Sequence, residues 1–152
     1  MVFINKFCPF NWFSMFLFPR QGFSIDPKLW RNIDISNQKK ITSNILKGIV
    51  IRQPRHLNLS WTNINRKQID WLIPRLPQLE SLSLVGCHSY VVSSLATCHC
   101  PRLAFLDISW SEGLNDDVMQ DLLSAPIDSR PGFMETKTRL RFLSELKICG
   151  NF

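Results

Sequence analysis

The stretch Leu79-Glu80-Ser81-Leu82-Ser83-Leu84-Val85-Gly86-Cys87 decides the fold of this 152-residue chain. It has the form L-x-x-L-x-L-x-x-C, in which Leu82 and Leu84 are separated by one residue. Residues spaced in this way point to the same side of a β-strand, so the stretch predicts a strand with one apolar side. Such a strand cannot bury its apolar side alone, and we therefore expect neighbouring copies of the same pattern.

Further copies of the pattern occur along the chain. Its fourth position is occupied in turn by Ile33, Leu57, Leu82, Leu106 and Leu146, which are 24, 25, 24 and 40 residues apart. The first three intervals match the roughly 20–29-residue period of leucine-rich repeats, and the last equals about one period plus an insertion. We therefore predict an α/β fold, a short leucine-rich-repeat solenoid of about five repeats with parallel strands on the concave side and helices outside.

The repeats also predict where the strands and helices lie. The strands are expected at residues 32–36, 56–60, 81–85, 104–109 and 144–149. Apolar residues at helical spacing predict helices at about 41–52, 66–75, 90–97 and 116–124. Thr42 or Ser43 is expected to cap the first helix, and Asn115 or Asp116 the last. Pro74 is expected to bend or stop the second, because proline lacks the N–H that a helix needs.

Residues 1–24 do not resemble the repeats. They hold seven of the eleven phenylalanines, and Pro19-Arg20-Gln21 stands where a secretory signal would have a small-residue cleavage site. We expect this segment to be disordered or non-native, and neither a signal nor a membrane anchor. Residues 25–152 are expected to form the repeats, with a proline-containing insertion at 125–142 between the last two. The fifth strand comes so close to the end that we expect an incomplete array.

Charge is unevenly distributed along the chain. The formal net charge is +6, with +8 between residues 28 and 75 and −3 between residues 76 and 152. A basic surface could meet nucleic acid or an acidic protein, although dispersed charges are also typical of solvated helix faces. The candidate basic patch consists of Lys39, Lys40, Arg52, Arg55, Arg66 and Lys67.

The sequence gives little support for metal binding or catalysis. Cys87-His88 and Cys98-His99-Cys100 lack the spacing of a zinc site, and the odd total of five cysteines favours reduced, structural thiols inside a cell. The histidines of the chain lie in no motif with a strained serine or a paired carboxylate. We therefore assign no catalytic, cofactor-binding or metal-binding residue and expect that the chain itself is not an enzyme.

Candidate protein-binding residues flank the inward positions of the strands. Asn58, Ser60, Asp107 and Ser109 are expected on the concave surface. Trp61 and Trp110 stand at the same offset after their strands and should lie near each other, two repeats apart. Tryptophan is common among interface anchors. The alternative is that both rings are buried in the turn between strand and helix.

Some local runs are more specific than the general repeat. They are Leu57-Asn58-Leu59-Ser60-Trp61-Thr62-Asn63-Ile64, Trp71-Leu72-Ile73-Pro74-Arg75-Leu76-Pro77 and Asp128-Ser129-Arg130-Pro131-Gly132-Phe133-Met134. Together they resemble the repeat region of the JmjC histone lysine demethylases that also carry CXXC, PHD, F-box and leucine-rich-repeat modules. The resemblance covers about residues 26–150, and its start, residues 26–34, is similar to the tail of an F-box.

The resemblance implies a non-catalytic protein-interaction module of a nuclear chromatin regulator. Its repeats would recognise a partner or substrate for an SCF-type ubiquitin ligase or a chromatin complex. The family's demethylase domain, CXXC and PHD fingers and most of the F-box find no match in these residues. We therefore expect neither a cofactor nor binding of a Skp-type adaptor, and only a minor role for nucleic acid. The alternative is a tail fragment of a histone H3 lysine demethylase, an iron/2-oxoglutarate dioxygenase.

Overall fold

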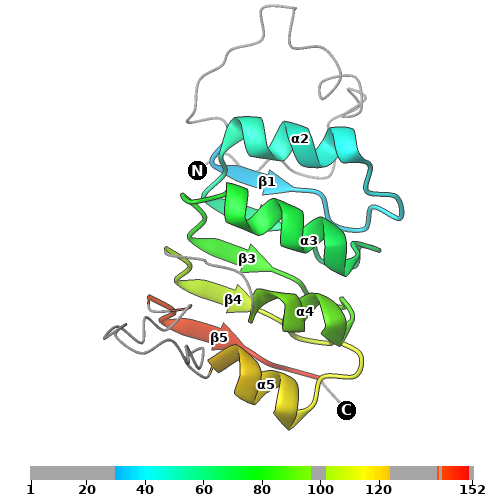
Figure 1. Ribbon diagram of the computed structural model, residues 1–152, viewed down its shortest axis with the longest axis vertical. Coiled ribbons are helices and arrows are strands. Elements are labelled where there is room, and N and C mark those ends of the chain that lie inside the picture. The colour runs from blue at the N-terminus through cyan, green and yellow to red at the C-terminus, as the bar shows by residue number, and fades with distance from the viewer. Residues whose placement is uncertain (1–29, 97–101, 124–139, 141, 151–152) are drawn as a thin grey trace, which may run out of the picture.

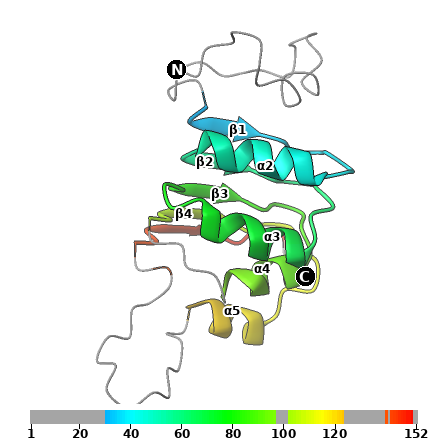
Figure 2. The same cartoon turned by 45° about the horizontal axis from the view of Figure 1, so that its top comes forward.

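The computed structural model describes residues 30–96, 102–123, 140 and 142–150. Within these ranges the fold is α/β, and its five strands form one parallel sheet in the order β1-β2-β3-β4-β5. The helices form a second layer on one side of that sheet (Figures 1 and 2). The phenylalanine-rich start, Cys98-His99-Cys100 and nearly all of the predicted insertion lie outside the described residues.

Strands and helices alternate along the described chain. The strands are β1 (Asn32–Asp34), β2 (His56–Asn58), β3 (Ser81–Ser83), β4 (Phe105–Asp107) and β5 (Glu145–Lys147). The helices are α2 (Ser43–Arg52), α3 (Arg66–Leu72), the short 3-10 helix η1 (Ile73–Arg75), α4 (Ser89–Leu95) and α5 (Asp116–Leu123). None of these described helices has the length and apolar character needed to cross a membrane.

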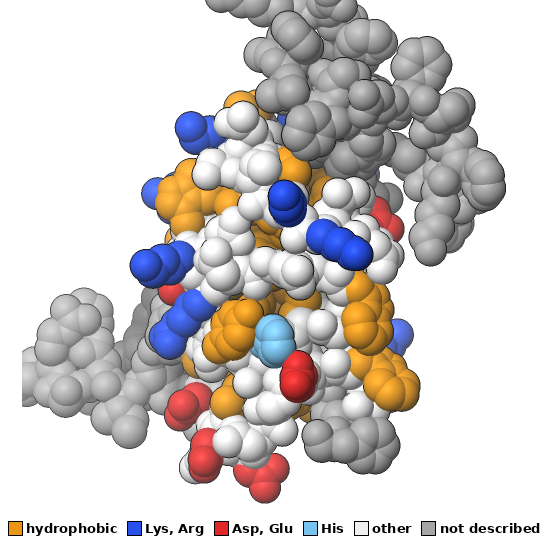
Figure 3. Space-filling view, turned by 90° about the vertical axis from the view of Figure 1, so that its right-hand side faces the viewer, with side chains coloured by type: hydrophobic (Ala, Val, Ile, Leu, Met, Phe, Trp, Pro, Cys, Tyr) orange, Lys and Arg blue, Asp and Glu red, His pale blue; other side chains and the backbone are white. Residues whose placement is uncertain are grey.

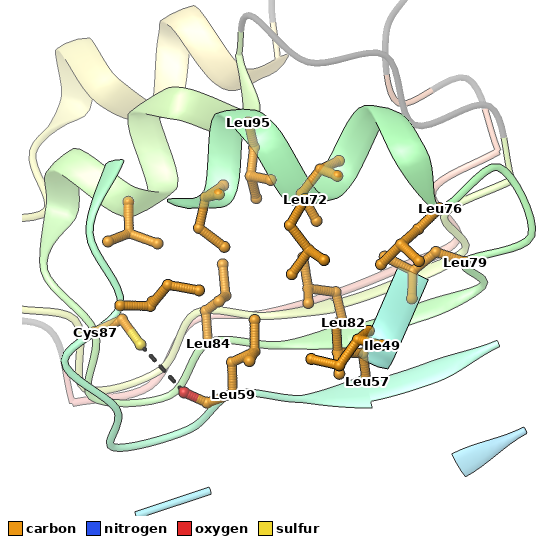
Figure 4. Close-up of a cluster of buried hydrophobic side chains, with 14 of the residues drawn as sticks. Ile49, Leu57, Leu59, Leu72, Leu76, Leu79, Leu82, Leu84, Cys87 and Leu95 are labelled. Carbon is orange, nitrogen blue, oxygen red and sulfur yellow. Dashed lines mark hydrogen bonds between the residues drawn. The ribbon is translucent and has the colours of Figure 1, made fainter. Parts of the chain in front are cut away.

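The register of the sheet follows the repeat frame. The residues predicted as strand centres are direct neighbours across the sheet: Ile33, Leu57, Leu82, Leu106 and Leu146. This confirms the frame, including the 40-residue interval before Leu146. The first four of these side chains are only 0–3% exposed. In Figure 4 the strand leucines point into the layer between sheet and helices, where helix residues such as Leu72 and Leu95 meet them.

The strands are shorter than the sequence predicted, at three residues each. In β1, β2 and β4, one reason is the polar side chain that ends the strand. Asn58 Oδ1 accepts a hydrogen bond from the backbone N–H of Ser60 at 3.0 Å, and Asp34 and Asp107 make the equivalent bond at 2.9 and 3.0 Å. A short polar side chain that bonds two residues ahead turns the backbone. The chain therefore leaves strand geometry before the predicted end.

Helix ends agree with the expected caps. Thr42 Oγ1 accepts from the N–H of Ile45 at 3.5 Å and so caps α2. Asn115 Oδ1 accepts from the N–H of Val118 at 3.0 Å at the start of α5. The second helix stops as α-helix at Leu72, and Pro74 lies in η1. A 3-10 turn accommodates Pro74 near its start, where the missing N–H is not needed.

Candidate protein-binding edge

The candidate site lies along the edge of the sheet where the carboxyl ends of the strands meet. Four residues after each strand centre, the backbone adopts the left-handed conformation, with φ between 56° and 69°. We call these residues the left-handed row: Asn37, Trp61, Gly86, Trp110 and Gly150. Glycine and asparagine adopt this conformation readily, whereas a bulky residue rarely does. Two tryptophans in the row are therefore unexpected from backbone preference alone.

Hydrogen bonds between repeats fix the spacing of the row. The N–H of Trp61 donates to the carbonyl of Val85 at 2.7 Å, directly before Gly86. The N–H of Gly86 bonds in the same way to Ser109, and that of Trp110 to Cys149. The row thus extends the sheet ladder beyond the strands, and its members are spaced like neighbouring strands, about 4.8 Å apart.

Each tryptophan ring lies on the glycine of the next repeat. A Cβ atom built on Gly86 would lie 2.6 Å from both Cδ2 and Cζ3 of Trp61. A Cβ atom on Gly150 would lie 2.5 Å from Cδ2 and 2.6 Å from Cε2 of Trp110. Because adjacent ring atoms are almost equally close, each indole presents its flat face to the glycine. Only glycine leaves room for this arrangement.

Both indoles are nevertheless largely exposed. Trp61 is 55% exposed and Trp110 is 56% exposed. The rings are therefore not buried in the turn, which was the alternative interpretation of the sequence. They occupy row positions two strands apart, with Gly86 between them. One face of each ring is covered by a glycine, so the exposed area lies on the remaining face and the ring edges. Binding of a partner by these rings stays a prediction.

The polar candidates next to the tryptophans support the turn. Asn58 is half-buried, and its side-chain oxygen accepts the N–H of Ser60. Asp107 makes the same bond to Ser109, also 3.0 Å long. Ser60 and Ser109 are each only 7% exposed. Ser60 and Ser109 therefore offer little surface, whereas Asn58 and Asp107 are partly exposed as well as holding the turn before each tryptophan. Partner binding by these residues stays a prediction.

A second row of small residues lies directly after the left-handed row and is buried. Thr62, Cys87 and Ser111 are 2–5% exposed. The Cys87 thiol points to the carbonyl oxygen of Leu59 at 3.5 Å (Figure 4). Burial raises the pKa of the Cys87 thiol, which keeps it neutral and unreactive. Among the described residues, no group of three or more His, Cys, Asp or Glu side chains could hold a metal ion.

The candidate basic patch is split by the fold. Lys39 and Lys40 follow β1, and Arg66 and Lys67 begin α3, so these four lie at the same edge as the left-handed row. A hydrogen bond of 2.8 Å from Gln68 Nε2 to the carbonyl of Ile41 ties the two segments together. Arg52 ends α2 and Arg55 precedes β2, which places them at the opposite edge. The six residues therefore do not form one surface.

The arginines of this set are engaged with neighbouring groups. The Arg52 guanidinium lies 4.2 Å from the centre of the Trp30 ring, and burial lowers its pKa. Arg55 pairs with Glu80 at 3.0 Å and Arg66 with Asp70 at 3.8 Å. Lys39, Lys40 and Lys67 are exposed at the left-handed-row edge.

Charge changes sign along this edge. Figure 3 looks onto it and shows Lys and Arg mainly over the first repeats and Asp and Glu mainly toward α5, with hydrophobic side chains between and beside them. Exposed carboxylates precede α5 at Glu112 and stand in its first turn at Asp116 and Asp117. Glu112 lies 3.2 Å from His88 Nδ1. The two tryptophans thus stand on a surface that is basic at one end and acidic at the other.

The glycines of the row are residues of the candidate site that sequence reasoning missed. The five repeat copies, once aligned, place Asn37, Trp61, Gly86, Trp110 and Gly150 in one column. Asparagine and glycine in that column are a signal for a left-handed turn. The contact of each indole with a glycine of the next repeat needs the register of the sheet, which only the structure supplies.

Comparison with known proteins gives the chain's relatives. The chain matches no family model. Over 125 residues it is 50% identical to lysine-specific demethylase 2B of Mus musculus and 44% identical to lysine-specific demethylase 2A of Xenopus tropicalis. Each match covers 82% of this chain but only 10% and 11% of the respective relative. The chain thus spans about a tenth of the length of these proteins. The predicted relation to these demethylases is thereby confirmed at the level of sequence.

Proposed function

We propose that this chain is a short leucine-rich-repeat solenoid that serves as a non-catalytic protein-interaction module. The module would correspond to the F-box/leucine-rich-repeat part of a nuclear chromatin regulator and would recognise a partner or substrate for an SCF-type ubiquitin ligase or a chromatin complex. Its sequence relation to lysine-specific demethylases 2A and 2B supports this assignment. The sheet register supports the solenoid, because the strand centres pair with one another at intervals of 24 or 25 residues, apart from the longer last interval.

One observation carries the binding role, namely the two exposed indoles in the left-handed row. A bulky residue in this conformation costs of order 1–2 kcal/mol, whereas Asn37, Gly86 and Gly150 meet the same backbone requirement more readily. Trp61 and Trp110 are more than half exposed, so full burial does not compensate for this cost. Strained residues that the fold does not need are often kept for function. Tryptophan is also among the residues that contribute most to protein interfaces.

Partner capture tests the proposal. The whole chain, a Trp61→Asn/Trp110→Asn variant and an Ile51→Ala control would be immobilised and incubated with nuclear extract. Asparagine suits the backbone because Asn37 already has it, and Ile51 is 79% exposed on α2, away from the row. We expect at least one protein to be retained by the chain and by the control but not by the tryptophan variant.

Direct binding completes the test. The retained protein would be purified, and its dissociation constant for each of the three chains would be measured. A loss of affinity confined to the tryptophan variant supports the module. Retention that is equal for all three chains contradicts it, because the row would then play no part in recognition.

A second candidate function comes from the names of the relatives, which are demethylases. The longer protein would then remove methyl groups from lysine of histone H3, and this chain would be a non-catalytic piece of it. The residues that the structure describes do not fit an iron centre, since they bring no suitable ligand group together. The full-length transcript distinguishes the candidates: an H-x-D metal motif encoded upstream favours the demethylase, and an F-box alone favours a ligase adaptor.

A further inference from the structure

The two indoles are equivalent platforms related by a translation of two strands. Trp61 lies on Gly86 and Trp110 lies on Gly150, and the ring atoms Cδ2 and Cε3 are among the three nearest to the glycine in both cases. Their backbone angles are also the same, with φ of 56°. Two steps of the row correspond to about 9.6 Å at the usual spacing of strands. The edge therefore offers two flat apolar surfaces of similar orientation, about 9.6 Å apart.

This spacing selects among the conformations that a bound segment can adopt. An extended strand presents side chains on one side every ~6.6–6.8 Å. An α-helix presents them at about 6 Å or, over two turns, about 10.5 Å. A polyproline-II helix repeats every three residues with a rise of about 3.1 Å per residue, which brings residues i and i+3 to the same side about 9.3 Å apart. Of these, the polyproline-II repeat comes closest to the spacing of the platforms.

We propose that the left-handed row binds a proline-rich segment in the polyproline-II conformation, with two prolines three residues apart stacked on Trp61 and Trp110. This inference rests on the proposed interaction function and specifies its partner. Proline rings are compact and apolar and suit the exposed face of an indole, and aromatic side chains line the grooves that bind such segments. The segment would run across the strand ends, from β2 toward β4.

Charge on the same edge determines which tryptophan lies near the acidic end of the segment and which lies near its basic end. Lys39, Lys40 and Lys67 stand at the Trp61 end and are exposed, while Asp116 and Asp117 stand at the Trp110 end. A segment with acidic residues before one proline and basic residues after the other would therefore be complementary along its length. Complementary charge of this kind speeds association and sets orientation.

A series of synthetic peptides tests the spacing. The probe is Glu-Glu-Pro-Ala-Ala-Pro-Lys-Lys with a fluorescent label, measured by anisotropy against the whole chain. Its companions have one or three alanines between the prolines, alanine in place of both prolines, or the reversed charge order. We expect the two-alanine spacing to bind at least about tenfold more tightly than the other spacings and the proline-free peptide. Trp61→Asn or Trp110→Asn should each remove a similar factor, and Ile51→Ala should remove none.

The outcomes separate this inference from the function on which it rests. Equal affinity for all spacings, equal affinity of the proline-free peptide, or no binding of any peptide overturns the proline-rich partner. If protein capture from extract still depends on Trp61 and Trp110 in that case, the interaction function stands without it. If capture is also independent of the tryptophans, both proposals fail. The peptide with the reversed charge order tests the direction of the bound segment. If it binds more tightly, the segment runs in the opposite direction, and its acidic end still lies near the lysines.

Discussion

The strand centres and the left-handed row repeat with the same period, but the strand centres share a type of side chain, whereas the row shares a backbone conformation. Every strand centre is isoleucine or leucine, and the first four are at most 3% exposed. The row repeats a backbone conformation instead, and its side chains range from none in Gly86 to the indole of Trp61. Close packing dictates side-chain size in the core, whereas the row shares a backbone conformation and restricts side-chain size only at Gly86 and Gly150, where an indole lies on the glycine. The row is therefore where side chains are free to serve recognition.

The largest effect is expected in the core. Leu82 is fully buried at the centre of the middle strand, and Leu82→Ala should lower the free energy of unfolding by about 2–5 kcal/mol. Leu146 holds the equivalent place in β5 but is only half-buried, so Leu146→Ala should cost clearly less. Urea denaturation of both variants measures the difference. Equal losses of unfolding free energy would show that the contribution of a strand centre to stability does not depend on its burial.

A smaller loss is expected when a methyl group is added in the row. Gly86→Ala meets both a φ of +69° and the ring of Trp61. The left-handed conformation of a non-glycine residue costs of order 1–3 kcal/mol, and the displaced ring should also change its fluorescence. Urea denaturation and tryptophan emission would be followed together. A fully stable variant with unchanged emission would contradict the stacking of Trp61 on Gly86.

The side chain that starts the turn should matter less than the glycine. Asn58→Ala removes the acceptor for the N–H of Ser60, and a lost bond of this kind costs about 0.5–1.5 kcal/mol. Asp107→Ala should behave alike, because it makes the same bond to Ser109. Thermal denaturation of both variants gives the comparison. If neither variant loses stability, these side chains do not hold the turn and their role as surface contacts regains support.

The smallest effect is a dependence of stability on pH. Burial raises the pKa of the Cys87 thiol above its ordinary 9.0, so the unfolded chain loses this proton at lower pH than the folded chain. The contribution of the neutral Cys87 thiol to stability is complete below about pH 9 and is lost as the pH rises through the raised pKa. Cys87→Ser should weaken this fall, since Ser111 shows that serine fits the equivalent position. An unchanged pH profile would mean that Cys87 does not ionise on unfolding.

Much of the fold could be predicted from the sequence because it depends on apolar period. Leu57, Leu82 and Leu106 stand at nearly equal intervals, and they are paired in register in the parallel sheet. The strand ends could not be placed, because the bond from the N–H of Ser60 to Asn58 competes with strand geometry. The caps of α2 and α5 were predicted to within one residue, since side chains such as Thr42 act locally.

The site was predictable in its residues but not in its geometry. Trp61 and Trp110 stand out by their shared offset, but their left-handed backbone runs against the preference of tryptophan. Their contacts are made with the following repeat and so depend on sheet register. The candidate basic patch was predicted as one surface because the sequence does not show at which edge of the sheet each residue lies. Arg52 and Arg55 lie where helices end and strands begin, opposite Lys39 and Lys40.

The stability of the Trp61→Gly/Trp110→Gly double variant tests the central claim most directly. Glycine already occupies two positions of the row, so the backbone requirement is met while both indoles are removed. Relief of the left-handed strain should offset the lost contact of the half-exposed rings, and the free energy of unfolding in urea should change by less than about 1 kcal/mol. A loss of several kcal/mol, comparable to that of Leu82→Ala, would contradict the account, because the tryptophans would then belong to the core.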